Sequence, residues 1–421
     1  MIFRKGTYLS MSDYEKDTPQ KLETLWQRNV FVLWFGVFMT GIALSEVMPF
    51  LALYIDTLGT FSKNQLSFYS GAVFAISFLA TAIVSPFWGK LADIKGRKLM
   101  LLRSALGMSV VLFLMGNVAH VWELFFLRAL QGIMGGFVSN ANALVATQTP
   151  KQHAGKALGI LVTGMTAGNL IGPLFGGILA TFFGYRMSFH ITGIILLLVF
   201  FLTLFLVKES PQVSTTHTAT ISTKTLWANV PDKRLIIGLF VTTMLVQTVN
   251  TSINPIISLF VRELMHSASN ATFIAGIVAA MPGIATVIAA PPFGRIGDHI
   301  GTDRMIKIGF MIAVIAFLPT AFVTSIGFLM FFRFLVGISD ATMLPAIQTL
   351  LSKSSPTDMT SRIFSYNQSF QSLGSVMGPM FGALIASIFD YRGIFIFSTI
   401  IIIINATLFN ATTRHLNTPA L

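Results

Sequence analysis

Residues 168–176 read Gly-Asn-Leu-Ile-Gly-Pro-Leu-Phe-Gly, and residues 374–382 read Gly-Ser-Val-Met-Gly-Pro-Met-Phe-Gly. Three more pairs keep an offset of 205 or 206 residues. They are Pro86-Phe-Trp-Gly89 with Pro292-Phe-Gly294, Leu124-Phe-Phe-Leu-Arg128 with Leu329-Met-Phe-Phe-Arg333, and Tyr185-Arg186 with Tyr391-Arg392. One match could arise by chance, but four in register indicate that the chain is an internal duplication.

The composition places both copies in a membrane. Of 421 residues, 54% are hydrophobic and 10% are charged, whereas soluble domains have roughly 45–50% and about 25%. The apolar stretches are long enough for helices of roughly 20 residues that cross the hydrocarbon core. The expected spans are 30–55, 66–88, 99–118, 121–146, 157–182 and 186–207, then 235–261, 270–293, 305–324, 325–350, 362–388 and 392–411.

The distribution of positive charge predicts the orientation. Of the 28 Lys and Arg residues, 22 fall in segments that are cytoplasmic if the N-terminus is inside. Two, Arg128 and Arg333, fall within spans, and four lie outside, namely Lys63, Arg186, Arg262 and Arg392. This bias predicts that both termini are cytoplasmic. The net charge of +12 therefore reflects short cytoplasmic clusters rather than a nucleic-acid-binding face.

The expected fold is an all-α integral membrane protein with twelve transmembrane helices in two parallel, pseudo-symmetric six-helix bundles. Halves in the same orientation are related by an axis along the membrane normal, and substrate binds between them near the midplane. The expected parts are a tail (1–29), an N-terminal bundle (30–207), a linker (208–234), a C-terminal bundle (235–411) and a tail (412–421).

The repeated motifs resemble the signature motifs of the major facilitator superfamily. The loop Gly89-Lys-Leu-Ala-Asp93-Ile-Lys-Gly96-Arg97-Lys98 is similar to the family's loop between helices 2 and 3, although Ile94 stands where an Arg is usual. The stretch around Gly172-Pro173 resembles the helix-5 motif of the antiporters. Val47-Met-Pro49-Phe-Leu-Ala-Leu-Tyr54 further resembles the MdtG-like multidrug efflux branch.

The glycine-rich motifs suggest gating and packing roles. We expect a gate latch at the loop, in which Asp93 and Arg97 pair with helix ends when the cytoplasmic side is shut; the alternative is a tight turn that obeys the positive-inside rule. The expected gating residues are Gly89, Asp93, Gly96, Arg97 and Asp298. The antiporter motif, whose small residues let two helices approach closely, comprises Gly168, Gly172, Pro173, Gly176 and Gly177.

Charged residues within the spans are the candidates for proton coupling. Glu46 and Asp340 are the two carboxylates well inside spans, and a carboxyl group in a poorly hydrated site can be protonated near neutral pH. Proton and cationic substrate would then compete for one charge. The alternative is an ion pair with Arg128 or Arg333. The resemblance implies that Arg128 takes part in proton transfer or stabilises one conformation; a purely structural contact is the alternative.

Polar side chains in several spans are candidates for substrate binding. Gln247, Asn250 and Asn254 form one stripe on a helix, at steps of three and four. Amides in a span also join helices without touching a ligand, so this alternative stays open. The full expected set is Glu46, Phe50, Tyr54, Asn142, Gln247, Asn250, Asn254, Asp340, Asn367 and Gln371.

These observations predict a proton-driven exporter of amphipathic, often cationic drugs in a bacterial plasma membrane. The alternative is the same fold exporting a sugar, a metabolite or a single antibiotic. We expect no cofactor or metal, the proton gradient as energy source, contact with membrane lipid, no nucleic-acid partner, and a functional monomer. An enzyme or receptor is disfavoured because no cluster of catalytic residues or sensor domain is visible, and an ATP-driven pump because no G-x-x-x-x-G-K-[ST] motif occurs.

Overall fold

The computed structural model describes residues 19–209, 232–266, 270–355 and 360–413, and within these ranges every regular element is a helix. The first half contains α2 (Pro19–Ser45), α3 (Leu51–Asp56), α4 (Lys63–Lys95), α5 (Arg97–Met115), α6 (Val121–Met134), α7 (Phe137–Gln148) and α8 (Lys151–Leu206). The second contains α10 (Lys233–Ser252), α11 (Ile257–Met265), α12 (Ala271–Ile300), α13 (Thr302–Thr320), α14 (Ile326–Ser354) and α15 (Thr360–Thr413).

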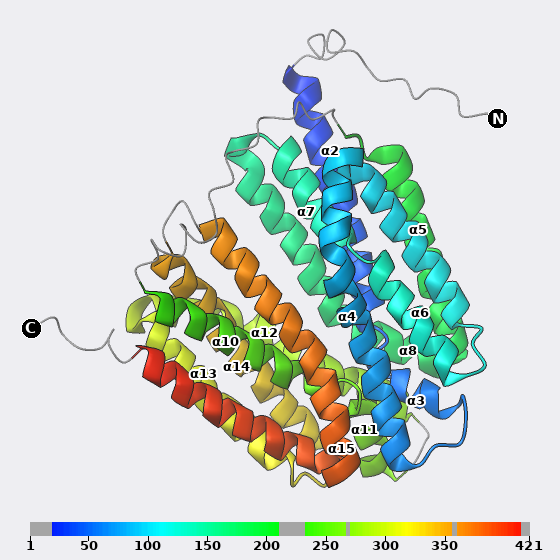
Figure 1. Ribbon diagram of the computed structural model, residues 1–421, viewed down its shortest axis with the longest axis vertical. Helices are drawn as coiled ribbons and strands as arrows, with labels where there is room; N and C mark the ends of the chain where they lie inside the picture. The colour runs from blue at the N-terminus through cyan, green and yellow to red at the C-terminus, as the bar shows by residue number, and fades with distance from the viewer. Residues whose placement is uncertain (1–18, 210–231, 267–269, 356–359, 414–421) are drawn as a thin grey trace, which may run out of the picture.

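These helices make twelve crossings, because the two longest each hold two. The 56-residue α8 is interrupted at Gly184 (φ 80°, ψ 164°), and the 54-residue α15 is interrupted at Asp390 (φ 66°, ψ 174°). Figure 1 shows the orange and red parts of α15 meeting at an angle. Large apolar side chains such as Ile83 and Phe182 are 70% and 75% exposed, as expected for surfaces that face lipid. The twelve-helix fold is confirmed.

Three of the expected continuous spans are broken in the structure. The first ends as α2 at Ser45 and resumes as α3 at Leu51, and the seventh is divided likewise between α10 and α11. Pro49 and Pro255 lie in these breaks; proline has no backbone N–H to donate and clashes with the preceding turn. The fourth span breaks at Gly136, whose φ of 107° is easily adopted only by glycine.

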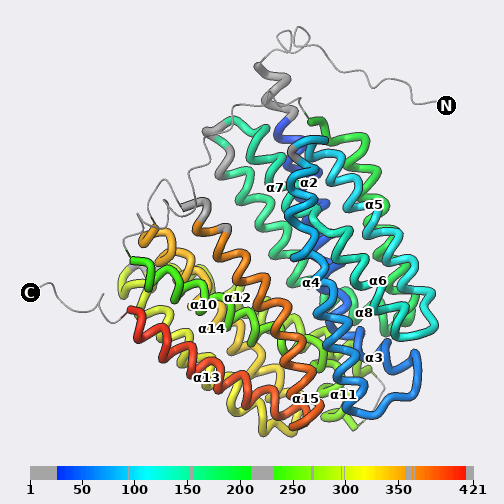
Figure 2. Tube along the Cα trace, in the orientation of Figure 1, coloured from blue at the N-terminus to red at the C-terminus, as the bar shows by residue number. Residues whose placement is uncertain are grey.

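The two halves meet at one end and separate towards the other. In Figure 1 they join near α3 and α11, and diverge towards the start of α2 and the end of α15; the trace in Figure 2 shows the same arrangement. We call these the closed end and the open end. The halves touch where α4 packs on α15, α8 on α12, and α3 on α11.

Small residues form two equivalent crossings between the halves. A Cβ added to Gly71 of α4 would overlap Ala383 of α15, and one added to Gly177 of α8 would lie 3.2 Å from the Cα of Gly276 in α12. Gly71 and Gly276 are repeat equivalents, as are Gly177 and Ala383. Each crossing therefore brings two backbones together where a larger side chain would hold them apart.

Candidate functional site

A cavity of about 470 Å³ lies between the halves and extends to Gly89 and Arg97 near the open end. This volume lies within the range of small-molecule sites. Most of its wall comes from α4, α6 and α7, and α15 closes one side with Gln368, Ser372 and Ser375. The polar lining is mainly hydroxyl and amide, with Ser77, Thr81, Ser85, Gln131, Ser139 and Asn140.

Arg128 is the buried charge in this wall. Its side chain is 4% exposed, and its Nη1 donates a 2.6 Å hydrogen bond to Oε1 of Gln131. Its Nε donates to the carbonyl of Val73 at 3.4 Å, and its guanidinium lies 5.6 Å from the ring centre of Phe74. No ion pair to Arg128 is found among the described residues. Within the described part of the chain, its charge is therefore met by hydrogen-bonding dipoles rather than by a carboxylate.

Glu46 lies outside this cavity in a separate, fully buried site. It directly follows the end of α2, where the first span breaks, and is 0% exposed. The hydroxyl of Thr192 donates to its Oε2 at 2.5 Å, while its Oε1 has no partner among the described residues. Within the described residues, Glu46 forms no ion pair with Arg128.

Asp340 occupies a different place, in the second half. Asn250 Nδ2 donates to both carboxylate oxygens of Asp340, at 2.9 and 3.1 Å. A small cavity of about 20 Å³ adjoins them, with Ser339 and Asn405 as its other polar lining residues. A site of this size holds about one water molecule. Arg333 is 7% exposed and forms no direct ion pair with Asp340.

The other expected binding residues lie outside the wall of the large cavity in this conformation. Phe50 and Tyr54 are buried in an aromatic cluster with Tyr185 and Phe189. Gln247 Nε2 donates to Ser375 Oγ at 3.1 Å, so it supports a lining residue. Asn254 lies in the break between α10 and α11, Asn142 lies on α7, and Asn367 and Gln371 lie on α15.

The antiporter-motif glycines divide between two contacts. Added Cβ atoms at Gly168, Gly172 and Gly176 would meet Phe38, Ser45 and Glu46 of the first span, within the same half. Gly177 instead faces Gly276 of the other half, and Gly276 also lies against the carbonyl of Pro173. The motif therefore packs the Glu46 segment on one side and forms a crossing between halves on the other.

The loop between α4 and α5 is held by a residue outside the predicted gating set. Glu209 accepts hydrogen bonds from the backbone N–H groups of Arg97 (2.7 Å) and Lys98 (2.8 Å), and so caps the start of α5. Gly96 has a φ of 93°, which explains the glycine there, and Gly89 has open space around it. The side chains of Asp93 and Asp298 lie outside the described part of the structure, so the latch stays a prediction.

Two further interactions were not foreseen. Arg103 and Trp88 supply donors to the carbonyls freed by the break between α6 and α7: Arg103 Nη2 to Gly135 at 2.6 Å, and Trp88 Nε1 to Ile133 at 2.8 Å.

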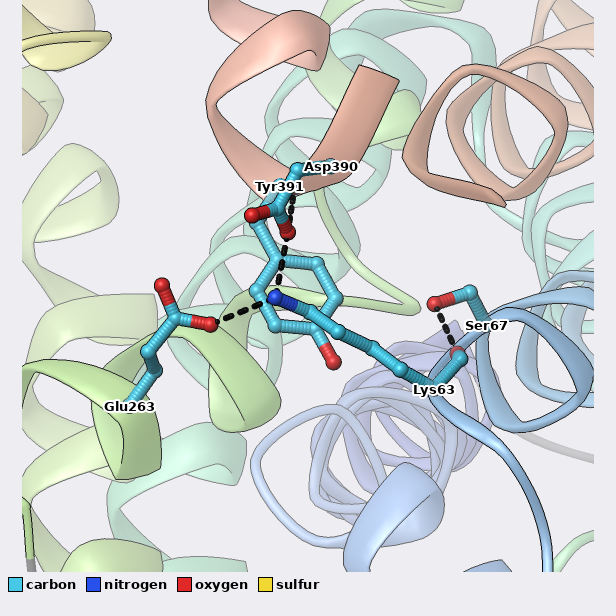
Figure 3. A network of polar contacts seen from close by, with 5 residues as sticks. All are labelled: Lys63, Ser67, Glu263, Asp390 and Tyr391. Atoms are coloured by element: carbon cyan, nitrogen blue, oxygen red, sulfur yellow. Dashed lines mark hydrogen bonds and ion pairs between the residues drawn. The ribbon is translucent and has the colours of Figure 1, made fainter. Parts of the chain in front are cut away.

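At the closed end, Lys63 meets Glu263 and Asp390 of the other half, as Figure 3 shows. Lys63 is one of the four cations that the sequence places outside, but the sequence does not indicate its partners.

The comparison with known families decides the identity of the fold. The model of the family described as Major Facilitator Superfamily matches residues 33–249 and again residues 239–419. The chain belongs to the Major Facilitator Superfamily. Its double match follows the internal duplication, and membership makes this superfamily protein a transporter rather than an enzyme.

Relatives within the superfamily agree with the MdtG-like resemblance. The chain is 46% identical over 396 residues to "Multidrug resistance protein MdtG" of Escherichia coli (strain SMS-3-5 / SECEC), covering 94% of this chain and 96% of that protein. It is 45% identical over 389 residues to the protein of the same name from Salmonella heidelberg (strain SL476), covering 92% and 96%. The resemblance to MdtG-like proteins is confirmed.

Solved superfamily structures share the fold at low identity. A bacterial homolog of the human lysosomal transporter Spinster, in an inward-facing and occupied conformation, matches with a TM-score of 0.78 and 15% identity, over 94% of this chain and 98% of that one. The nucleoside transporter NupG matches with a TM-score of 0.74 and 14% identity, over 93% and 99%.

Proposed function

We propose that this protein exports chemically diverse amphipathic drugs across a bacterial plasma membrane by alternating access, with proton entry as the driving force. The observation that carries the proposal is one-sided access. The cavity between the halves reaches the open end, whereas Gly71–Ala383 and Gly177–Gly276 hold the backbones together towards the closed end. The names of the MdtG relatives support multidrug efflux as the cargo.

The charge bias assigns sides to this geometry. With the termini in the cytoplasm, the open end is cytoplasmic, so the cavity is poised to receive a drug from inside. Rocking one half against the other would then close the cytoplasmic side and expose the cavity outside, as expected for parallel repeats. We propose that one chain suffices, because the cavity is bounded by the two halves of a single chain.

Glu46 and Asp340 are the proposed proton carriers. Glu46 accepts a hydrogen bond from the hydroxyl of Thr192, and Asp340 accepts hydrogen bonds from the amide of Asn250. Both carboxylates lie away from the large cavity, and neither has an ion-pair partner among the described residues. A carboxyl group held this way can lose and regain a proton as its surroundings change between the two conformations. In this conformation the described cavity wall contains two cations, Arg97 and Arg128, and no carboxylate. A substrate with a hydrogen-bond acceptor or an acidic group is therefore complementary to it.

The test is transport in inverted membrane vesicles that contain the protein, with vesicles lacking it as control. Addition of a proton gradient should drive uptake of ethidium and of a fluoroquinolone, and a protonophore should stop both. Uptake that survives the protonophore would refute proton coupling. Uptake of one compound only would favour the narrow exporter, and uptake equal to that of control vesicles would refute drug export.

A further inference from the structure

Asp390 has a backbone conformation that ordinarily belongs to glycine. Its φ of 66° and ψ of 174° interrupt α15 between its two crossings. This region of the backbone map is essentially restricted to glycine, and a non-glycine residue held there is strained. Its repeat equivalent, Gly184, has nearly the same angles (80° and 164°). The fold therefore needs this turn in both halves, and only the second half builds it with a side chain.

The side chain of Asp390 reaches across the interface between the halves. Its Oδ1 lies 2.6 Å from Lys63 Nζ, at the first residue of α4 in the other half, and also accepts from the backbone N–H of Tyr391 at 2.6 Å. The ammonium group of Lys63 lies 4.4 Å from the ring centre of Tyr391 and 2.8 Å from Glu263 Oε2. Figure 3 shows Lys63 held between these groups. Three residues of the second half thus surround one cation of the first.

This contact exists only while the closed end is closed, because its members lie in different halves. A backbone strained in one conformation persists only where the surrounding structure compensates for it. The carboxylate of Asp390 supplies such compensation by meeting Lys63. Glycine would make the turn at lower conformational cost but could not make the contact.

We propose that Asp390 is a positioning residue of the transport cycle, whose strained turn presents its carboxylate to Lys63 and so holds the closed end shut in the conformation that takes up substrate from the open end. The assignment rests on the proposed alternating access.

The test measures opening of the closed end directly. The chain contains no cysteine, so Ala119→Cys and Thr324→Cys, exposed and repeat-equivalent positions in the two closed-end loops, can carry spin labels without background. Distances between the labels are measured in reconstituted protein with and without Asp390→Gly, Asp390→Asn, Lys63→Ala and the double variant Lys63→Ala/Asp390→Gly.

We expect three single substitutions to favour opening of the closed end: Asp390→Gly, Asp390→Asn and Lys63→Ala. Each should raise the ratio of molecules in which this end has opened to molecules in which it is shut by about two- to fivefold, as expected for loss of a half-exposed ion pair. Asp390→Gly in the Lys63→Ala background should add nothing. An unchanged distribution in Asp390→Gly or Asp390→Asn, or additive shifts in the double variant, would overturn the proposal. Because the distances require no drug, they are informative even if vesicle transport refutes the proposed efflux.

Gly184→Asp is the matched control for strain. It places the same side chain on the same turn of the first half, where an added Cβ meets nothing within 4 Å. It should lower the melting temperature, whereas Asp390→Gly, which removes strain, should lower it less than Gly184→Asp does. A larger fall for Asp390→Gly, without any change in label distance, would make Asp390 a folding residue only and refute the positioning role.

Discussion

The carboxylate of Asp56 lies 2.6 Å from the guanidinium of Arg262, and the two residues occupy the same position in the two repeats. Residues near a twofold axis meet their own equivalents across it. In identical halves, this position would set two like charges against each other. Divergence to opposite charges turns the contact into an ion pair that joins α3 to α11 at the closed end.

The Asp56–Arg262 pair predicts the result of a charge exchange. Asp56→Arg or Arg262→Asp alone should lower the ratio of closed to open molecules by about three- to tenfold, because attraction is replaced by repulsion between half-exposed groups. The exchange Asp56→Arg/Arg262→Asp should restore it, since the positions are equivalent. The spin-label pair at residues 119 and 324 measures this; failure of the exchange to recover closure would contradict the prediction.

Glu46 and Thr192 predict a loss of proton coupling. Their equivalents in the second half are Ser252 and Ser398, whose hydroxyls lie 3.4 Å apart, so the same helix contact exists there without a charge. Glu46→Gln should reduce gradient-driven uptake in vesicles to the level of empty vesicles while preserving the fold. Thr192→Val should also impair uptake, and Thr192→Ser should not, because it keeps the hydroxyl.

The matched control for this prediction lies in the second half. Ser252→Ala should leave gradient-driven uptake nearly unchanged, since no titratable group is lost. Full proton-driven uptake in Glu46→Gln would show that another residue carries the proton. Asp340→Asn, tested alone and with Glu46→Gln, identifies whether that residue is Asp340.

Arg128 predicts a change in selectivity. Arg128→Gln should reduce vesicle uptake of a fluoroquinolone, which bears a carboxylate, about tenfold more than uptake of ethidium, because a charge-assisted hydrogen bond is worth about 1.5–3 kcal/mol. Arg128→Lys should retain part of the preference. Equal losses for both compounds would show that Arg128 does not contact the acidic group.

The crossing at Gly71 and Ala383 predicts a steric block. Gly71→Val should strongly disfavour closure of the closed end and reduce uptake, because overpacking of this kind costs about 1–3 kcal/mol and is borne only by the closed conformation. Gly327→Ala, where an added Cβ has open space, serves as the control. Normal uptake by Gly71→Val would mean that the halves do not approach closely there during transport.

Glu209 predicts a loss of stability. Glu209→Ala leaves the first N–H groups of α5 without their carboxylate, which should cost about 0.5–2 kcal/mol and lower the melting temperature of the purified protein. Glu209→Gln should cost less, because its amide oxygen still accepts one hydrogen bond. Equal melting temperatures for all three proteins would show that the cap does not contribute.

Much of the scaffold could be read from local sequence. Apolar length predicts the crossings, and the recurrence of Arg128 as Arg333 and of Gly172-Pro173 as Gly378-Pro379 predicts the duplication. The breaks after Ser45 and at Gly136 were missed, although Pro49 and the paired glycines carried a signal for them. Hydropathy does not detect a short interruption of a helix, so a long apolar stretch by itself predicts one continuous span.

The buried charges of the candidate site were predictable from the sequence, but their hydrogen-bond partners and the wall of the large cavity were not, since no expected substrate-binding residue lines that wall. Glu46, Asp340 and Arg128 stand out because a charge in a span is costly. Their neighbours Thr192, Asn250 and Gln131 are ordinary polar residues, and only the packing shows which of them donates to which charge. Thr192 is 146 residues from Glu46, so no local pattern links them.

The sequence by itself therefore determined the membrane fold, its duplication and the charges that the hydrocarbon core makes exceptional, because these depend on the hydrophobic effect acting residue by residue. The tertiary structure decided which end of the molecule is closed and which charges meet there. Asp56 with Arg262, and Lys63 with Asp390, are neighbours only because two halves of one chain pack about a common axis, and that packing depends on the shapes of whole helices.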